Sequence, residues 1–254
     1  LNISDRGIFY LRQSGGEHAD QVATYQGFAR SIAFVFIPSM AFYLRRSRWF
    51  YPVFLLGSVA LLFNGARSEF VFAIFSIFFL VVLYSISSSK RFVALFGLIL
   101  VLLACVYIGF SFLSDVFPKS RMLEIANMSE TSSAEGRSEK GRYSLNLISE
   151  SPFWGDYGGY STLGPGAYPH SVLSAWIDSG IVGFTLYIFM FFLLWGTALS
   201  DYGRYKHYQT YKVFLIFLTF VTVSVLLSKN HQYMGFGLLA GFYVQHRRLT
   251  LGIE

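Results

Sequence analysis

The sequence has 254 residues, of which 54% are hydrophobic, 19% aromatic and only 13% charged, with a mean hydropathy of +0.49. This composition excludes an ordinary soluble domain and predicts a polytopic membrane protein. The formal charge of +6 does not indicate a nucleic-acid partner, because half of the 20 Lys and Arg residues lie in four short clusters between apolar segments, where positive charge orients a membrane protein. The single cysteine, Cys105, lies in an apolar run, which leaves neither a disulfide framework nor a thiolate metal site.

The first half of the chain is predicted to hold a connector and four membrane segments. Residues 1–21 are polar and lack a signal-peptide pattern, so we interpret them as an external connector, and because the sequence begins at Leu1 we expect a longer protein to continue before it. Residues 22–113 contain four apolar runs, at 25–44, 49–63, 70–86 and 92–113. The second and third runs are short for a span of about 20 residues, and the turn NGARSE joins them. Basic clusters on both sides predict that this pair crosses outward and returns, which places Arg67 at its outer tip.

The second half of the chain begins with a large external loop, residues 114–170, which carries five Lys or Arg residues and seven Asp or Glu residues. The stretch MSETSSAEGRSEKG is polar and predicted to be mobile, whereas RYSLNLISESP has apolar residues at helical spacing and a proline stop, which predict a short helix and a turn. The glycine-rich loop that follows contains Tyr157, Tyr160 and Tyr168 and matches no phosphate-binding glycine motif.

Residues 171–254 are predicted to form an interfacial helix and three membrane segments, at about 181–199, 213–227 and 234–244. Counting the crossings places the clusters RRSR, KR, RYKHYQTYK and HRR on one side, as the positive-inside rule requires. The predicted fold is therefore an all-α polytopic membrane bundle of about seven transmembrane helices, with a large external loop that contains short helices.

Two sequence patterns resemble the O-antigen ligase and polymerase superfamily over about residues 22–245. One is the short outward turn with an arginine, NGARSE; the other is the external loop that runs GR, then P and G, then HS, then GIVG. The resemblance implies a membrane glycosyltransferase that acts on polyprenyl-diphosphate-linked glycans at the outer face of the bacterial cytoplasmic (inner) membrane. The interval between the HS pair and the next glycine, Val172–Ser179, is eight residues, one fewer than is usual in this family.

The resemblance and the chemistry of the residues select the same candidate site. A lipid diphosphate donor needs groups that hold the diphosphate, and arginine grips phosphate oxygens in a fork without a metal, so Arg67 and Arg142 are the catalytic arginine candidates. His170 is the candidate base, because an imidazole with a pKa near 6.5 is largely neutral at physiological pH and can take a proton from an acceptor hydroxyl. Arg121, Arg137, Tyr157 and Tyr160 are candidate substrate-binding residues. We expect neither a metal site nor a cofactor, because no HExxH or DxD-type pattern occurs and the five histidines are scattered.

Each candidate also has a simpler interpretation. Arg67 can snorkel in its turn or pair with Glu69, Arg142 can be a solvated loop residue, and His170 can sit at the end of the interfacial helix. The tyrosines can serve as anchors at the membrane interface, as can Arg30, Lys229 and His231. If His170 is not the base, Asp178 and Glu150 are the next residues to test.

The sequence leaves two classes of function. The first is a glycosyltransferase with a polyprenyl-diphosphate-linked glycan donor and a glycan or lipid acceptor: a polymerase of lipid-linked repeat units, or alternatively an O-antigen ligase that transfers the glycan to lipid A core. The second class is a transporter or flippase of the lipid-linked glycan, which predicts ionisable residues in the middle of spans. The runs are nearly free of charge and the charged residues gather in the external loop, which favours the enzyme.

Overall fold

The computed structural model describes residues 2–3, 9–10, 25–44, 48–64, 66–85, 107, 132–160 and 171–252. The chain divides into two compact units, Leu1–Met128 and Ser129–Glu254. Both units are built from helices, which confirms the all-α prediction. Within the described residues, the β structure is a pair of two-residue strands, β1 (Asn2–Ile3) and β2 (Phe9–Tyr10), which pair antiparallel.

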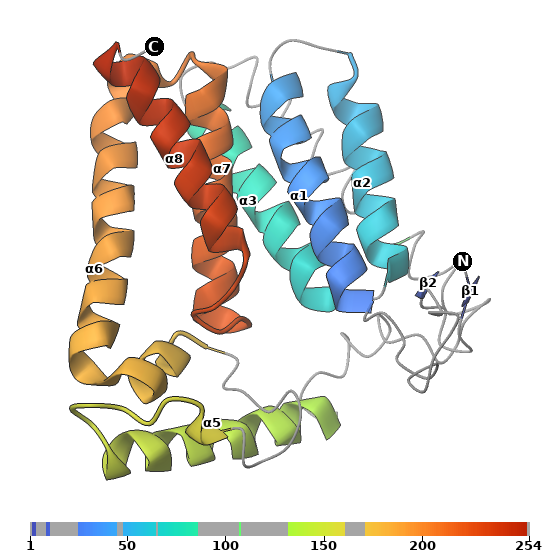
Figure 1. Cartoon of the computed structure of the whole chain (residues 1–254). Coiled ribbons are helices and arrows are strands. Elements are labelled where there is room, and N and C mark those ends of the chain that lie inside the picture. The colour runs from blue at the N-terminus through green and yellow to red at the C-terminus, as the bar shows by residue number, and fades with distance from the viewer. Residues whose placement is uncertain are drawn as a thin grey trace, which may run out of the picture. The chain divides into compact units, whose positions relative to one another are not determined.

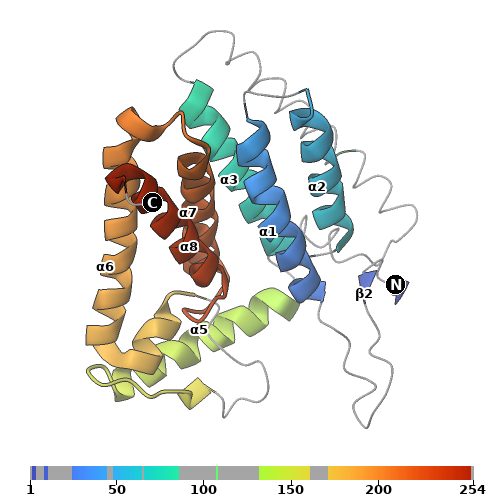
Figure 2. The ribbon, with the colours of Figure 1, turned by 45° about the horizontal axis from the view of Figure 1, so that its top comes forward.

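The described part of the first unit contains three apolar helices: α1 (Tyr25–Tyr43), α2 (Phe50–Asn64) and α3 (Arg67–Ser85). Helix α1 packs against both α2 and α3 (Figures 1 and 2). Its buried residues Ala29, Ala33, Ile37 and Met40 recur at helical spacing, so they form one continuous stripe along the helix. The alanines in this stripe are small, which lets neighbouring helices approach closely.

Helix α3 begins three residues before the apolar run that predicted it, so Arg67 is a helical residue and not part of a longer turn. The first turn of a helix tolerates polar residues, because its backbone N–H groups lack partners inside the helix. The acidic residue of this turn, Glu69, also interacts favourably with the positive end of the helix dipole. The fourth predicted membrane segment, 92–113, lies outside the described residues except for Tyr107.

The second unit contains α5 (Ser132–Glu150), α6 (Leu173–Tyr205), α7 (Gln209–Leu227) and α8 (Gly235–Leu251). Helix α5 includes ten residues that the sequence predicted to be mobile, so that prediction fails from Ser132 onward. Alanine, glutamate, arginine and lysine are strong helix formers, and they supply half of this stretch, although it lacks an apolar face. Helix α5 ends just before Pro152, as the proline stop predicted.

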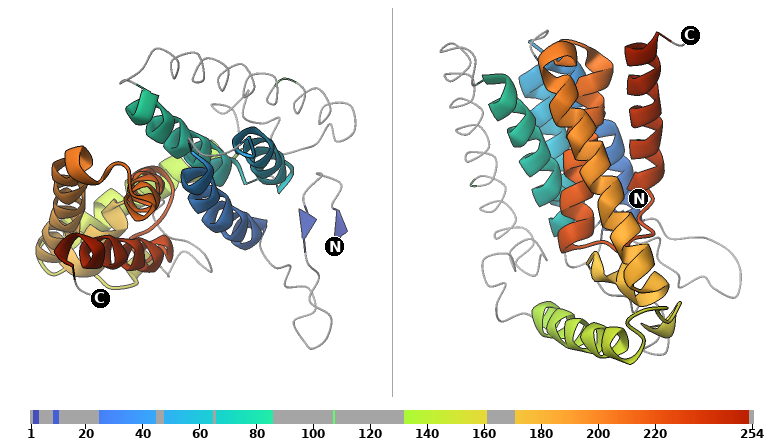
Figure 3. Two further views of the ribbon diagram at one scale, coloured as in Figure 1. Left: turned by 90° about the horizontal axis from the view of Figure 1, so that it is seen from above. Right: turned by 90° about the vertical axis from the view of Figure 1, so that its left-hand side faces the viewer.

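Helix α7 forms the core of the second unit and contacts both α6 and α8 (Figure 3). Its residues from Phe214 to Val221 are all buried. Among the described helices, α3, α6 and α7 are long and apolar enough to cross a membrane, and shorter apolar helices cover 27–43 and 50–64. The polytopic membrane character predicted from composition is therefore present in the structure.

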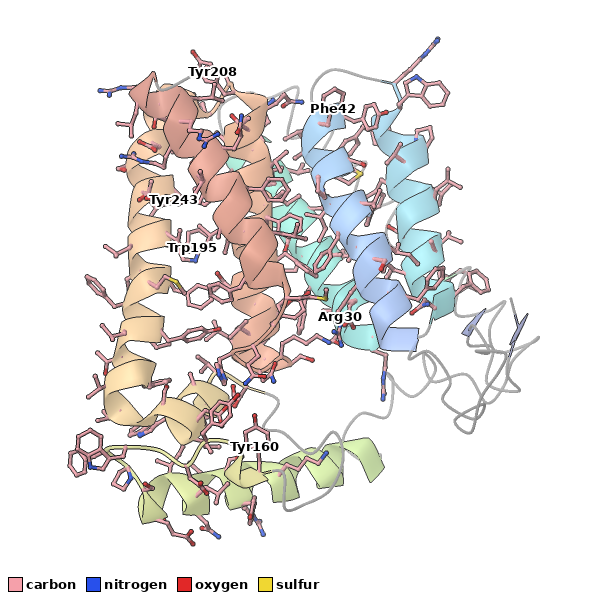
Figure 4. The ribbon with its side chains drawn as sticks, in the orientation of Figure 1. Arg30, Phe42, Tyr160, Trp195, Tyr208 and Tyr243 are labelled. Atoms are coloured by element: carbon pink, nitrogen blue, oxygen red, sulfur yellow. The ribbon has the colours of Figure 1, made fainter. Side chains whose placement is uncertain are left out.

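The two ends of the second unit differ in chemistry. Tyr208, in the turn between α6 and α7, and Tyr160, in the loop after α5, lie at opposite ends of this unit (Figure 4). At the Tyr208 end, Nε2 of His246 lies 2.8 Å from Oδ2 of Asp201, which ties α8 to α6. This end also carries the basic residues Arg204, Lys206, Lys212, Arg247 and Arg248. The Tyr160 end is the one that holds the glycine-rich loop.

Candidate active site

The loop 151–160 is joined to a break in α6. Gly180 has φ 66° and ψ −173°, so it interrupts the helix between a short first section and the long apolar section. In an uninterrupted helix the N–H of Ile181 would donate to the carbonyl of Ile177. Here the Ile181 N–H donates to the carbonyl of Pro152 at 3.0 Å, and the Ile177 carbonyl accepts from the N–H of Asp156 at 2.5 Å. The loop therefore supplies both of the partners that the break removes.

Close approach of two backbones explains the glycines at this junction. A Cβ atom on Gly180 would lie 2.0 Å from the carbonyl oxygen of Phe153, and one on Gly155 would lie 2.5 Å from the amide nitrogen of Gly180. Both glycines also have positive φ values. The indole Nε1–H of Trp176 donates to the Pro152 carbonyl at 2.9 Å. The proline and glycines of the external-loop pattern are thus neighbours in space, and they fix the loop to the start of the apolar section.

Asp178 is the centre of the polar contacts at this end of the second unit. It lies in the short first section of α6, and its side chain is only 2% exposed. Its Oδ1 accepts from the backbone N–H of Gly158 at 3.0 Å, and its Oδ2 accepts from the phenol of Tyr160 at 3.1 Å. Because both oxygens are occupied and shielded from solvent, Asp178 is poorly placed to serve as the reserve base that the sequence suggested.

His231, in the turn between α7 and α8, completes this cluster. Its Nε2 lies 3.5 Å from Oδ2 of Asp178, and its Nδ1 lies 3.2 Å from Oγ of Ser174. The backbone N–H of His231 donates to the same Ser174 oxygen at 2.8 Å. Burial lowers the pKa of His231 below its ordinary value, against the opposing effect of the Asp178 carboxylate. His231 is therefore neutral at physiological pH.

The tyrosines proposed as substrate-binding residues occupy different environments. Tyr160 is partly buried, and its burial, together with the nearby Asp178 carboxylate, raises the pKa of its phenol to about 12. Tyr157 is 79% exposed and the neighbouring Trp154 is 88% exposed, so their rings are available to a ligand or to the headgroup region. Tyr160 is thus held by the protein, whereas Tyr157 is free to meet a substrate.

The basic candidates of the loop are only partly described. Arg142 lies on α5 and is exposed. Glu150, the other reserve base, is the exposed last residue of α5. His170 and Arg121 lie outside the described residues, as does the side chain of Arg137.

In the first unit, polar residues gather where α2 ends and α3 begins. Arg67 is the first residue of α3 and is half-buried. Glu69 is 1% exposed; its carboxylate lies 3.9 Å from Nε of Arg30 and accepts from the hydroxyl of Ser68 at 2.7 Å. Figure 4 shows Arg30 near the end of α1 opposite Phe42. Arg30, predicted as an interface anchor, therefore also lies within ion-pair distance of a buried carboxylate.

The role of His231 was not recognised from the sequence. It lies 57 residues after Ser174, so no local pattern connects the two. A weak signal was present in α6, because Ser174 and Asp178 are four residues apart and lie on one face of a helix. Among the described residues, no group of three or more His, Cys, Asp or Glu side chains is arranged to hold a metal ion.

Comparison with protein families supports the resemblance. The sequence matches the O-antigen ligase family over residues 52–188, which is more than half of the chain. The chain belongs to the O-antigen ligase family. The matched region includes Arg67, Arg142, His170 and the break at Gly180, but it ends before His231. Comparison with curated proteins gave no match, and comparison with solved structures gave none either. Membership makes the protein a membrane glycosyltransferase of the O-antigen ligase and polymerase type.

Proposed function

We propose that this O-antigen ligase family member is a polymerase that joins polyprenyl-diphosphate-linked repeat units at the outer face of the bacterial inner membrane. An acceptor hydroxyl attacks the anomeric carbon of the donor glycan, the bond from that carbon to the diphosphate oxygen breaks, and the hydroxyl proton passes to a base. The observation that carries the proposal is the junction at Gly180, which fixes the glycine-rich loop to the start of an apolar span. The loop lies at the end of its unit that is opposite the basic clusters, as an external site requires.

Arg67 and Arg142 are the proposed diphosphate ligands. Arg67 lies in the first turn of α3, where the backbone N–H groups and the helix dipole also favour an anion. The buried Glu69 carboxylate of the same turn lies 3.9 Å from Nε of Arg30. Arg142 is exposed on α5 and available to bind phosphate. A fork of guanidinium N–H groups stabilises the charge that develops on the leaving diphosphate, so no metal is required in the proposal.

The two alternatives differ from the polymerase in testable ways. An O-antigen ligase uses the same donor but transfers the glycan to lipid A core. A transporter or flippase needs ionisable groups in the middle of spans. In the described membrane-length helices, these ionisable side chains lie near the helix ends. Arg67 and Glu69 are in the first turn of α3, and Lys212 is near the start of α7. Asp201 and Arg204 are near the end of α6. This distribution favours the enzyme.

The decisive experiment is product analysis with the purified protein in lipid vesicles and a defined polyprenyl-diphosphate glycan. A ladder of lengthening lipid-linked glycans supports the polymerase, transfer only to added lipid A core identifies a ligase, and movement of the donor across the bilayer without transfer refutes both. Arg67→Ala is expected to abolish transfer, and Arg67→Lys to restore little of it, because a point charge cannot replace the guanidinium fork. Arg204, an exposed arginine at the Tyr208 end of the second unit, provides the control, and Arg204→Ala should retain wild-type transfer.

A further inference from the structure

Asp178 and His231 contact described residues that flank the segment 161–170 at both of its ends. At the first end, Asp178 accepts from the Gly158 backbone and from the Tyr160 phenol. At the second end, Ser174 lies one helical turn after the segment, and its Oγ contacts both the backbone and the ring of His231. Asp178 and His231 in turn face each other at 3.5 Å.

The same contacts show that the cluster is not a hydrolase triad, although it contains a serine, a histidine and an aspartate. Ser174 is 0% exposed, so its hydroxyl cannot reach a substrate. A nucleophilic serine would also need its oxygen free for attack. In this structure that oxygen accepts the backbone N–H of His231. The cluster therefore has a composition associated with catalysis but an arrangement suited to holding chain segments together.

A single tautomer of His231 satisfies all of these contacts. With the proton on Nε2, the ring directs its N–H toward the Asp178 carboxylate, and Nδ1 accepts the hydroxyl proton of Ser174. The Ser174 oxygen then remains free to accept the His231 backbone N–H. This assignment follows from the hydrogen-bond network. It leaves neither ring nitrogen available to deprotonate a substrate, so His231 is not a second catalytic base.

We propose that Asp178 and His231 are positioning residues for glycan transfer, which hold Tyr160 and Ser174 and thereby fix the loop 151–160 and the first section of α6 to the turn between α7 and α8. The proposal rests on the transfer activity proposed above and adds two residues to it. Asp178 acts on the loop 151–160, and His231 acts on the first section of α6. The pair acts through other residues and does not touch the reacting atoms.

The first test measures transfer by variants of His231. Asparagine places its amide near the Nδ1 position and glutamine places its amide near the Nε2 position, so His231→Asn keeps the Ser174 contact and His231→Gln keeps the Asp178 contact. We expect His231→Ala to lower kcat about 100-fold, as a displacement of a catalytic group by about 1 Å does. We expect at least one amide variant to recover part of this loss, with KM for the donor little changed in all three variants. His207→Ala, an exposed histidine at the Tyr208 end, should behave as wild type.

The pH profile separates positioning from catalysis. If His231 positions the chain, its amide variants keep the acidic limb of the wild-type profile at a lower level. Loss of that limb in these variants would make His231 the base and overturn the proposal. Wild-type kcat in His231→Ala, at equal abundance and thermal stability, would overturn it as well.

The second test does not depend on activity. Spin labels are placed on Tyr157→Cys and Gln232→Cys in a Cys105→Ser background, because both labelled positions are exposed in the second unit. The width of the distance distribution, measured by pulsed electron resonance, reports how firmly the loop is held to the α7–α8 turn. We expect the distance distribution to be wider in Asp178→Ala than in the parent protein. Tyr160→Phe removes only one hydroxyl, so we expect a smaller widening there. This second variant keeps the test valid if Asp178→Ala does not fold. Unchanged widths in both variants overturn the positioning role. If the labelled proteins show these differences in width but the unlabelled wild-type protein transfers no glycan, the proposed function is refuted and the positioning of the loop stands.

Discussion

Replacing Gly180 by alanine tests the junction between the loop and α6 directly. The residue has φ 66° and ψ −173°, a combination that is essentially restricted to glycine and costs another residue about 1–3 kcal/mol. The new Cβ would lie 2.0 Å from the Phe153 carbonyl oxygen, so the loop must also move away. That movement breaks the bonds from Ile181 and Trp176 to the Pro152 carbonyl, each with a net value of about 1 kcal/mol. We therefore expect Gly180→Ala to destabilise the protein by roughly 3–5 kcal/mol.

The assay is equilibrium unfolding by titration with SDS in mixed micelles, and α6 itself offers a control. Gly196 lies in the long apolar section, and a Cβ atom there would meet nothing within 4 Å. Gly196→Ala should therefore leave stability unchanged or raise it by up to about 1 kcal/mol, because alanine favours the helix over glycine. If Gly180→Ala is as stable as Gly196→Ala, the reasoning about the junction is refuted.

Three further outcomes are expected. In spheroplasts, a membrane-impermeant thiol reagent should label a cysteine at Ser133 but not one at Ser47; the reverse pattern contradicts the proposed orientation. His170→Ala should reduce transfer severely while donor binding persists and chelators have little effect; loss of donor binding would instead assign the residue to the diphosphate. Because burial lowers the pKa of folded His231, the unfolded chain binds more protons in acid, so stability present above pH 6.5 should be lost as pH falls below it. His231→Asn should lose less stability over the same range, and equal losses would show that other groups control the acid sensitivity.

The helices of this protein could be predicted from the sequence because their signal is local. The ends of the apolar runs that predicted α1, α2 and α7 differ by at most a few residues from the ends of these helices. The agreement arises because lipid-facing and core-facing positions are both apolar, and because the run must be about as long as a membrane span. The division of residues 172–199 into a short helix and a span was also foreseen, because Gly180 stands between them. Helix α5 was only partly foreseen, since its first half has helix-forming residues without an apolar face.

The contacts of the candidate site could not be predicted in the same way. Asp178 appeared in the sequence only as a reserve base, whereas its role depends on Gly158 and Tyr160, which approach it through the loop. His231 appeared as an interface anchor, because its partner Ser174 lies in another helix. The packing of the helices determines which of these residues become partners. A single sequence contains no periodic pattern that predicts this packing.

The break at Gly180 also determines where the chain can change in length. The residues of the first section of α6 that make these contacts lie at fixed distances before Gly180: Asp178 is two residues before it, Ile177 three and Ser174 six. In a continuous helix, loss of one residue would rotate everything beyond it by about 100°. Here the span takes its direction from the loop bonds at Ile181, so a residue missing between His170 and Ser174 changes neither the span nor the Asp178 contacts. The eight-residue interval after the HS pair, one shorter than is usual in the family, is therefore compatible with an intact junction. Single-residue deletions before Ser174 should keep this junction, whereas deletions between Ile177 and Ile181 should disrupt it.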